Sequence, residues 1–240
     1  MADLGLELRD LSVGVGDATI LHDISLRVPP GEAHVLLGPN GSGKSTVLSA
    51  IMGLPPFEVT GGDITYDGAS LVGRPPDERA AKGLGMAFQR PPELPGVTVR
   101  DFAAALGAEE ALQREASELD LAAFAERDLN VGFSGGEIKR FEVLKLFLQG
   151  PDLLLFDEPE SGVDLEHIAA VGAAVTRLLK TPGRDGRQRS ALLITHTGVI
   201  LDHIDADKAH IMAGGRILHS GPPRALFQHI QRNGYVAPAA

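Results

Sequence analysis

The chain has 240 residues, of which 43% are hydrophobic and 22% charged, which suits one folded domain with a small inserted lobe. Its formal net charge of −10 argues against nucleic acid as the main partner, because a phosphate backbone binds a basic surface. The sequence contains no cysteine, which excludes disulfides, thiolate metal sites and a catalytic thiol.

The N-terminal third reads as strands around one glycine-rich loop. Residues 1–12 lack the basic and apolar segments of a secretory signal, and no apolar run approaches a membrane span, so we expect a soluble, cytoplasmic protein. Segments 6–15 and 20–28 alternate apolar and polar residues, as half-buried strands do. The run AHVLLG predicts a buried strand, GPNGSGKST follows it, and VLSAIMGL continues as a helix. Next, GGDITYDGASL predicts a hairpin that turns at Asp67–Gly68.

The rest of the chain alternates helices and buried strands. We expect a short helix over 76–84, a strand at GMAF, a proline-rich loop over 90–97 and a helical lobe from Val99 to about Asp128. Strands at 153–157 and 191–196 are separated by a helix at 165–180, and a hairpin and a last helix follow. The pattern predicts an α/β fold: a mostly parallel sheet, an N-terminal antiparallel section and a helical subdomain at about 90–150, within one domain spanning 1–240.

The stretch GPNGSGKST fits the phosphate-loop pattern G-x-x-x-x-G-K-[ST] and lies between a predicted strand and a predicted helix, as that motif requires. In such loops, backbone N–H groups at the start of the helix bind the phosphates. Lys44 would contact the β- and γ-phosphates, and the Ser45 hydroxyl would bind Mg²⁺. We therefore predict a nucleotide-binding loop made of Gly38, Pro39, Asn40, Gly41, Ser42, Gly43, Lys44, Ser45 and Thr46.

An acid pair, Asp157 and Glu158, follows the apolar run LLLF, at the strand end where ligands of parallel sheets bind. Because side chains alternate along a strand, we expect the two carboxylates to point apart. Asp157 would then lie near the Mg²⁺ ion while Glu158 polarises the attacking water.

Gln89 and His196 each follow another predicted strand. Gln89 could sense Mg²⁺ and the γ-phosphate, and a neutral His196 could hydrogen-bond the γ-phosphate and the water. Each also has a simpler interpretation, since a strand-end glutamine or a single histidine is more often structural. The acids and histidines between 196 and 210 match no compact metal-ligand spacing. The basic loop 184–189 is most simply a solvated loop.

The stretch NVGFSGGEIKRFE, residues 130–142, has two interpretations. Ser134 and Glu137 fit a capping box, and Gly150–Pro151 ends the helix, so a capped helix without a ligand is one. However, Gly135 and Gly136 each cost about 1 kcal/mol relative to alanine inside a helix. Their presence favours a helix start that an anion approaches closely. The helix that follows would bury one apolar face, made of Ile138, Phe141, Leu144 and Leu148.

Five motifs, in order and spacing over nearly the whole chain, resemble the ATP-binding-cassette (ABC) ATPases: the phosphate loop, Gln89, FSGGE, LLLFDEPESGVD and His196. The resemblance implies Mg²⁺-dependent ATP hydrolysis with Glu158 as the catalytic base and His196 as the switch histidine. Ser45, Gln89 and Asp157 would be the metal-binding residues. It also implies a transient homodimer in which Ser134, Gly135, Gly136 and Glu137 close over ATP held by the other subunit. Ser161, Gly162 and Asp164 would form the D-loop at that interface.

Within this family, MAFQRPPELPGV, NVGFSGGEIKR, ITHTGVILDHI and a terminal NGY are similar to the ATPase subunit of the SUF iron–sulfur cluster assembly machinery. Phe133 and Glu137 replace the leucine and glutamine that transporter ATPases more often carry. Val15 matches the position where many cassette ATPases stack an aromatic ring on adenine, as in the SUF subfamily, and it leaves base selectivity open. Two features depart from that subfamily: the lobe between Pro95 and Asn130 is short, and DEPESGVD contains a proline.

The SUF resemblance implies a soluble partner, a SufB/SufD-like scaffold, with no nucleic acid and no insertion into a membrane. Because the chain has no cysteine, the scaffold would hold the iron and sulfur, and ATP-driven dimerisation would rearrange it. The alternative is the nucleotide-binding subunit of a membrane ABC transporter, which shares every catalytic motif. A cassette protein of DNA repair or translation is disfavoured by the acidic charge and the lack of a basic arm.

Overall fold

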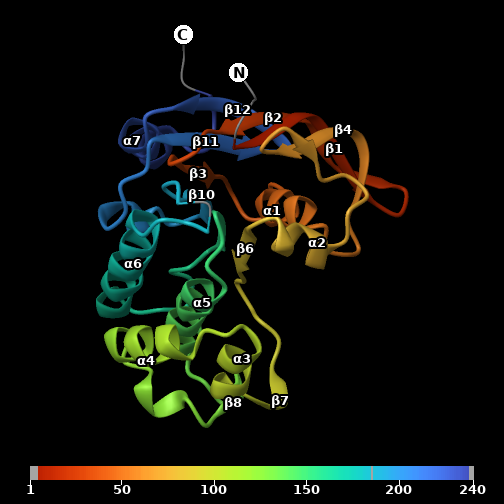
Figure 1. The fold of residues 1–240 in the computed structure, drawn as a ribbon. Helices are drawn as coiled ribbons and strands as arrows, with labels where there is room; N and C mark the ends of the chain where they lie inside the picture. Colours follow the sequence, from red (N-terminus) through yellow and green to blue (C-terminus); the bar gives the residue numbers. More distant parts are fainter. Residues whose placement is uncertain (1–4, 185, 238–240) are drawn as a thin grey trace.

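The computed structural model describes residues 5–184 and 186–237, and a six-stranded sheet forms its centre (Figure 1). The strand order is β12-β11-β3-β10-β9-β6, and every neighbouring pair is parallel except β11 with β12. The carboxyl ends of β3, β9 and β10 therefore lie at the same edge. The strands are β3 (Ala33–Leu37), β6 (Leu84–Ala87), β9 (Leu153–Asp157), β10 (Ser190–Thr195), β11 (Lys208–Ala213) and β12 (Arg216–Gly221).

An antiparallel sheet covers one face of the central sheet, with the order β2-β1-β4-β5. Its strands are β1 (Leu6–Val15), β2 (Ala18–Val28), β4 (Glu58–Tyr66) and β5 (Ala69–Ser70). The helices α1 (Lys44–Met52) and α2 (Pro76–Ala81) lie below it in Figure 1. Leu153 and Leu155 of β9 belong to the hydrophobic core on this side, together with residues of β1, β2 and α1.

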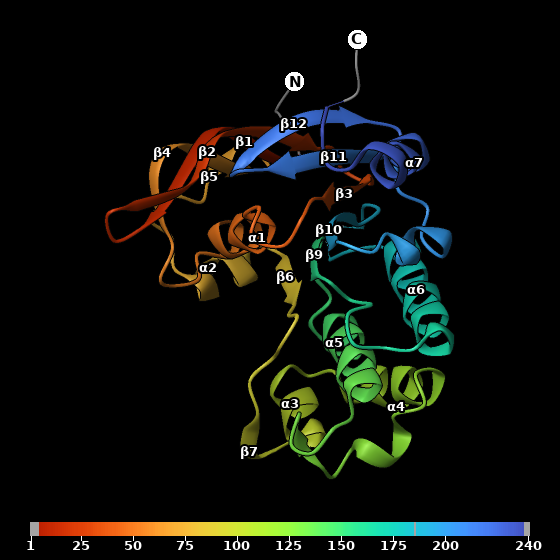
Figure 2. The ribbon, with the colours of Figure 1, turned by 180° about the vertical axis from the view of Figure 1, so that it is seen from behind.

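Helices cover the other face of the central sheet. Figure 2, which shows the molecule from behind, labels three of them, α5, α6 and α7. Leu154 and Phe156 of β9 pack there with α5 (Gly135–Gln149), α6 (Leu165–Lys180) and α7 (Pro223–Asn233). The turn η2 (Val199–Asp202) follows β10. With both faces covered, β3, β9 and β10 are buried along their whole length, as parallel strands are. The predicted fold class, a mostly parallel sheet with an antiparallel section and a helical subdomain, is confirmed.

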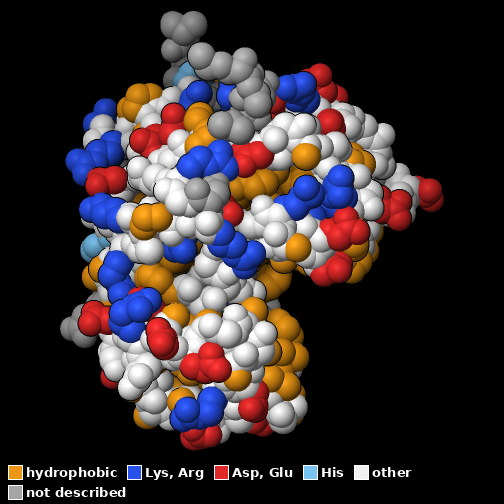
Figure 3. Space-filling model, viewed as in Figure 1, with side chains coloured by type: hydrophobic (Ala, Val, Ile, Leu, Met, Phe, Trp, Pro, Cys, Tyr) orange, Lys and Arg blue, Asp and Glu red, His pale blue; other side chains and the backbone are white. Residues whose placement is uncertain are grey.

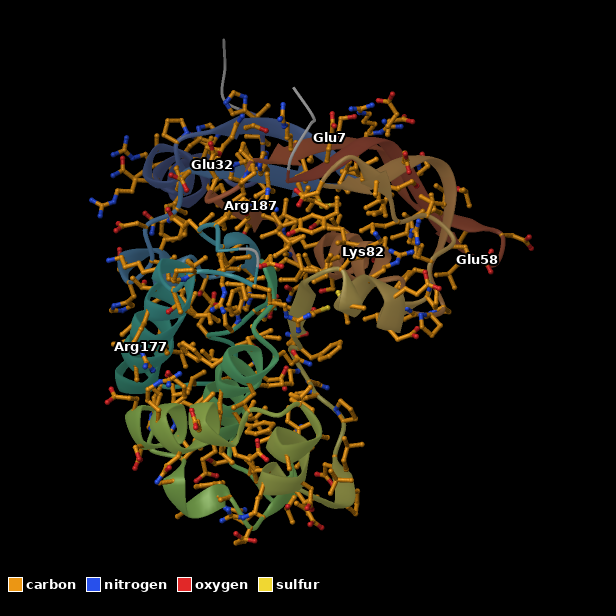
Figure 4. All side chains as sticks on the ribbon, in the orientation of Figure 1. Glu7, Glu32, Glu58, Lys82, Arg177 and Arg187 are labelled. Carbon is orange, nitrogen blue, oxygen red and sulfur yellow. The ribbon has the colours of Figure 1, made fainter. Side chains whose placement is uncertain are left out.

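A lobe lies below the central sheet in Figure 1, and α5 lies between the lobe and the sheet. It contains β7 (Leu94–Thr98), α3 (Val99–Ala105), α4 (Glu109–Glu118), η1 (Ala122–Phe124) and β8 (Asp128–Leu129). Arg177 of α6, labelled in Figure 4, donates a 2.5 Å hydrogen bond to the buried Glu115 of α4 and ties the lobe to the core.

Two loop expectations were wrong in part. Where a proline-rich loop was expected over 90–97, Leu94–Thr98 forms a strand that pairs with β8. A two-stranded sheet has only edges, and an edge tolerates Pro95 because its missing N–H breaks no central ladder. In the basic loop 184–189, of which residue 185 lies outside the described residues, two arginines are held rather than freely solvated: Arg187 pairs with Asp67 at 2.5 Å, and Arg189 donates to the Leu178 carbonyl at 3.2 Å.

Within the described ranges, every helix is too short or too polar to cross a membrane. On the face shown in Figure 3, basic and acidic side chains are interspersed rather than gathered into one basic area.

Candidate active site

The phosphate loop joins β3 to α1 at the edge where the parallel strands end. Gly43 precedes the helix with a φ of +99°, a conformation that favours glycine. At Gly38, a Cβ atom would lie 2.3 Å from the carbonyl oxygen of Met212, so only glycine fits. The buried Lys44 donates to the carbonyl oxygens of Gly38 and Pro39 at 2.8 and 3.0 Å, and its burial lowers the pKa of its ammonium. The loop thus places a cation beside the first-turn N–H groups, which suits a phosphate chain.

A cavity of about 570 Å³ lies over this loop, within the size range of small-molecule sites. It brings together residues that the sequence places on five different segments. The described lining residues are Ile20, Asn40, Gly41, Ser42, Gly43, Lys44, Ser45, Thr46, Gln89, Glu158, Ser161 and His196. Ile20 is the one large apolar side chain among them, and Val15 does not line the cavity in the described part of the chain.

Ser45 and Asp157 form a pair of potential oxygen ligands for a metal ion, at the start of α1 and the end of β9. The Ser45 hydroxyl donates to Asp157 Oδ1 at 3.1 Å, and Asp157 is buried. Burial raises the pKa of Asp157, the hydrogen bond from Ser45 opposes this rise, and the charge of Glu158 adds to it. Hydroxyl and carboxylate oxygens are the donors that Mg²⁺ prefers, so this pair fits a magnesium ion.

Glu158 lies at the centre of the polar contacts. Its Oε2 accepts a 2.6 Å hydrogen bond from Gln89 Nε2, and its Oε1 lies 3.1 Å from His196 Nδ1. The two acids do make separate contacts, but strand alternation is not the cause. β9 ends at Asp157, and Glu158 has a φ of +49°, so a left-handed turn directs its side chain.

Two residues of α5 hold the backbone around Gln89. Lys139 Nζ donates to the Gln89 carbonyl at 2.9 Å, and Glu142 Oε2 accepts from the Phe88 N–H at 2.6 Å. Glu142 also pairs with Lys145 at 2.6 Å. Burial lowers the pKa of Lys139. The sequence analysis missed both residues, because a lysine and a glutamate three positions apart are typical of an exposed helix face, whereas these are 5% and 2% exposed.

The loop after β10 carries His196 and has partners on two sides that were also missed. The buried Glu160 accepts hydrogen bonds at Oε1 from the hydroxyls of Thr195 and Thr197. Burial raises the pKa of Glu160. On the other side, the Tyr235 hydroxyl donates to the His196 carbonyl at 3.1 Å. Resemblance to the terminal NGY was the only signal for Tyr235.

Ser134 caps α5 as predicted. Its hydroxyl accepts from the Glu137 N–H at 3.4 Å, while its own N–H donates to Glu137 Oε2 at 2.7 Å, which confirms the capping box. These hydrogen bonds lower the pKa of Glu137. The helix ends at Gly150, also as predicted, and Phe141, Leu144 and Leu148 are buried while Ile138 packs partly buried against them.

The glycine pair of this stretch is not part of the cavity over the chain's own phosphate loop. None of the described lining residues comes from 133–137, and Ser134 and Gly135 are exposed. Ser161 reaches the cavity, and the neighbouring D-loop residue Gly162 faces Gly135, where an added Cβ would lie 2.9 Å from the Gly162 carbonyl oxygen. Asp164, at the start of α6, contacts His167 instead, which lowers its pKa.

Comparisons with known proteins identify the family and the fold of the chain. A family model described as ABC transporter matches residues 21–161. A relative named "Probable ATP-dependent transporter SufC", from Escherichia coli (strain K12), is 39% identical over 96% of this chain and 97% of its own. A "Probable ABC transporter ATP-binding protein" of Streptococcus pyogenes serotype M18 is 38% identical over 98% of this chain and 94% of its own. A solved ATP-binding cassette of an ABC transporter in its ADP conformation shares the fold, with a TM-score of 0.78 at 22% identity, covering 97% of this chain and 96% of that one.

Proposed function

The chain belongs to the ABC ATPase family, and from this premise we propose that it is the ATPase subunit of a SUF-type iron–sulfur cluster assembly complex in the cytoplasm. Family membership means that it binds nucleotide and hydrolyses ATP. The observation that carries the SUF assignment is the match to the Escherichia coli relative named SufC, which extends over nearly the full length of both chains. Phe133 and Glu137 support it, because transporter cassettes more often carry leucine and glutamine there.

The residues around the cavity have different roles in the proposed hydrolysis of ATP. The phosphate loop and Lys44 bind the phosphates. Ser45, Asp157 and Gln89 would hold Mg²⁺, which would supply charge neutralisation at the transferred phosphoryl group. Glu158 accepts the proton of the attacking water as general base. Gln89 and His196, at 2.6 and 3.1 Å from its two carboxylate oxygens, keep that carboxylate directed at the water.

The second half of the site comes from another copy of the chain. The exposed start of α5 presents Ser134, Gly135 and Gly136 with their N–H groups at a helix N-terminus, where an anion is favoured. Because this loop does not line its own chain's cavity, we assign it to the ATP held by a second subunit, with Ser161, Gly162 and Asp164 near the interface. ATP would join two subunits, and hydrolysis would let them separate.

A scaffold partner of the SufB/SufD kind would use this cycle. The chain has no cysteine, so thiolates for iron and sulfur must come from the partner. The net charge of −10 and the interspersed surface charges fit a protein partner better than nucleic acid (Figure 3).

A membrane transporter is the second candidate, and it is favoured by the Streptococcus pyogenes relative named as an ABC transporter ATP-binding protein. The two candidates differ in what binds the chain. We would purify the tagged chain with its native partners in mild detergent, which retains both soluble and membrane proteins. The SUF assignment predicts a soluble partner that carries iron and acid-labile sulfide. Recovery of a membrane-spanning permease without iron would contradict it.

A further inference from the structure

The C-terminal tail of the chain folds back onto the loop that carries His196. After α7, the Gly234 N–H bonds the Ile230 carbonyl at 2.9 Å, and His229 Nε2 lies 3.0 Å from the Val236 carbonyl oxygen. These contacts direct the tail toward the loop, where the half-buried Tyr235 donates its hydroxyl to the His196 carbonyl at 3.1 Å.

The same loop also accepts a second tether, because its hydroxyls donate to a buried carboxylate. Glu160, only 3% exposed, follows β9 and accepts hydrogen bonds from Thr195 and Thr197, the two neighbours of His196. The Thr195 hydroxyl also accepts from the Gly198 N–H at 2.9 Å. At Gly198, with a φ of +69°, an added Cβ would lie 2.0 Å from the Phe227 ring of α7. Each residue of the loop therefore has a fixed neighbour.

We propose that Tyr235 and Glu160 are positioning residues that hold the peptide of His196, so that its Nδ1 stays 3.1 Å from Glu158 Oε1. A fixed peptide leaves only the side-chain torsions of the imidazole to be ordered before the reaction. For either contact to affect turnover, His196 must act in hydrolysis as proposed above. The C-terminal tail thus has a role in the active site although it lies far from every nucleotide-binding motif in the sequence.

Tyr235→Phe tests this directly, because it removes one hydroxyl and leaves the ring. We expect kcat for ATP hydrolysis to fall about 3- to 10-fold, the factor that one neutral hydrogen bond sustains. KM for ATP should change less than about twofold, because Tyr235 does not line the cavity in the described chain. Tyr66→Phe is the matched control: it changes the chain's other tyrosine, buried in β4, and should leave kcat unchanged.

A double variant distinguishes positioning from a general structural role. With His196→Ala already present, Tyr235→Phe should lower kcat by less than about twofold further, because coupled residues are not additive. An equal loss in both backgrounds would overturn the proposal, as would a Tyr235→Phe enzyme with wild-type kcat. If His196→Ala alone retains wild-type kcat, the catalytic role of His196 fails first, and the positioning role fails with it.

Variants of Glu160 give an independent test, because a conservative and a non-conservative replacement can be compared. Glu160→Gln keeps an oxygen acceptor for the two threonines and should retain kcat within about threefold, whereas Glu160→Ala removes the acceptor and should lose more than about tenfold. Equal activity of these two variants would contradict the role of Glu160. If Glu160→Ala does not fold, the effect of Tyr235→Phe in the wild-type and His196→Ala backgrounds decides the proposal.

Discussion

At the scale of single residues, the contacts of Glu158 are the most informative about the proposed hydrolysis of ATP. One of its carboxylate oxygens accepts a hydrogen bond from Gln89, the other lies 3.1 Å from His196 Nδ1, and a left-handed turn directs it into the cavity. In the proposed mechanism, a carboxylate held in this way takes a proton from water in one orientation. The neighbouring Asp157 faces Ser45 instead and suits the metal.

Replacing Glu158 by glutamine should separate binding from hydrolysis. We expect Glu158→Gln to bind ATP as well as wild type but to turn over at least about 100-fold more slowly, because the amide cannot accept the proton. ATP should therefore accumulate on the protein, which nucleotide retention and phosphate release would measure together. Glu115→Gln, a change at another buried carboxylate, is the control for loss of charge in the fold. Unchanged hydrolysis by Glu158→Gln would rule out its role as base.

A second residue-scale prediction concerns two buried histidines away from the active site. His34 lies 2.8 Å from Glu32 at Nε2 and 3.2 Å from His210, and His210 lies 2.7 Å from Ser220. These hydrogen bonds are satisfied together when both rings are neutral, and a further proton on His34 Nδ1 would place two donors face to face. Burial, with His34 and Lys208 nearby, lowers the pKa of His210 from 6.5 to about 3.

The pH dependence of stability follows from that pKa. Above pH 6.5 both the folded and the unfolded chain keep His210 neutral. Between pH 6.5 and about 3 the unfolded chain binds a proton that the folded chain does not, so stability falls as the pH falls. We would measure the free energy of unfolding in urea from pH 7.5 to 4. It should fall less steeply with falling pH for His210→Gln than for wild type. The exposed His203→Gln should keep the wild-type slope, and identical slopes for all three proteins would refute the prediction.

At the scale of elements, α5 connects the parts of the site. Its first turn carries the glycine pair, its middle holds the backbone of Phe88 and Gln89 through Glu142 and Lys139, and its buried face packs on the central sheet. A displacement of the helix start would therefore reach Gln89 and, through it, Glu158.

The two glycines at the start of α5 should respond differently to alanine. At Gly136 an added Cβ has ordinary contacts of 3.4 Å or more, so Gly136→Ala should keep or raise stability by up to about 1 kcal/mol. It should nevertheless abolish ATP-driven dimerisation, because the methyl group blocks close approach of the partner's phosphates. Gly135→Ala should lose stability, since its Cβ would lie 2.9 Å from the Gly162 carbonyl oxygen. Thermal melts and sedimentation with ATP measure both effects, and normal ATP-driven dimers of Gly136→Ala would contradict the trans role.

The sequence predicted those parts of the site whose signals are local. The capping box of Ser134 and the strand before Asp157 are encoded within a few residues, so pattern alone located them. Glu142, Glu160 and Tyr235 were missed because their partners lie 54, 35 and 39 positions away, and only the folded sheet brings them together. The turn at Glu158 was missed for a different reason, since nothing in its sequence favours a positive φ.

At the scale of the whole molecule, the chain has one cavity over its phosphate loop and one exposed helix start, at Ser134 and Gly135, that does not line this cavity in the described residues. The described lining of the cavity over the phosphate loop includes Lys44, Ser45 and Glu158, while the stretch around Ser134 lies outside it. Two chains arranged symmetrically would complete two sites, which is how an isologous dimer uses one surface twice. We therefore propose that the active unit is a pair of chains.

Mixing two inactive variants tests this claim most directly. Lys44→Ala disables the phosphate loop. Ser134→Ala disables the loop at residues 134–137, called the signature loop below, so each homodimer should be inactive. In a heterodimer, one site combines the intact phosphate loop of one chain with the intact signature loop of the other. An equimolar mixture should therefore recover up to about a quarter of the wild-type ATPase rate, because random pairing gives half heterodimers with one working site each. No recovery at any ratio, with heterodimers demonstrated by two-tag purification, would contradict a site shared between chains.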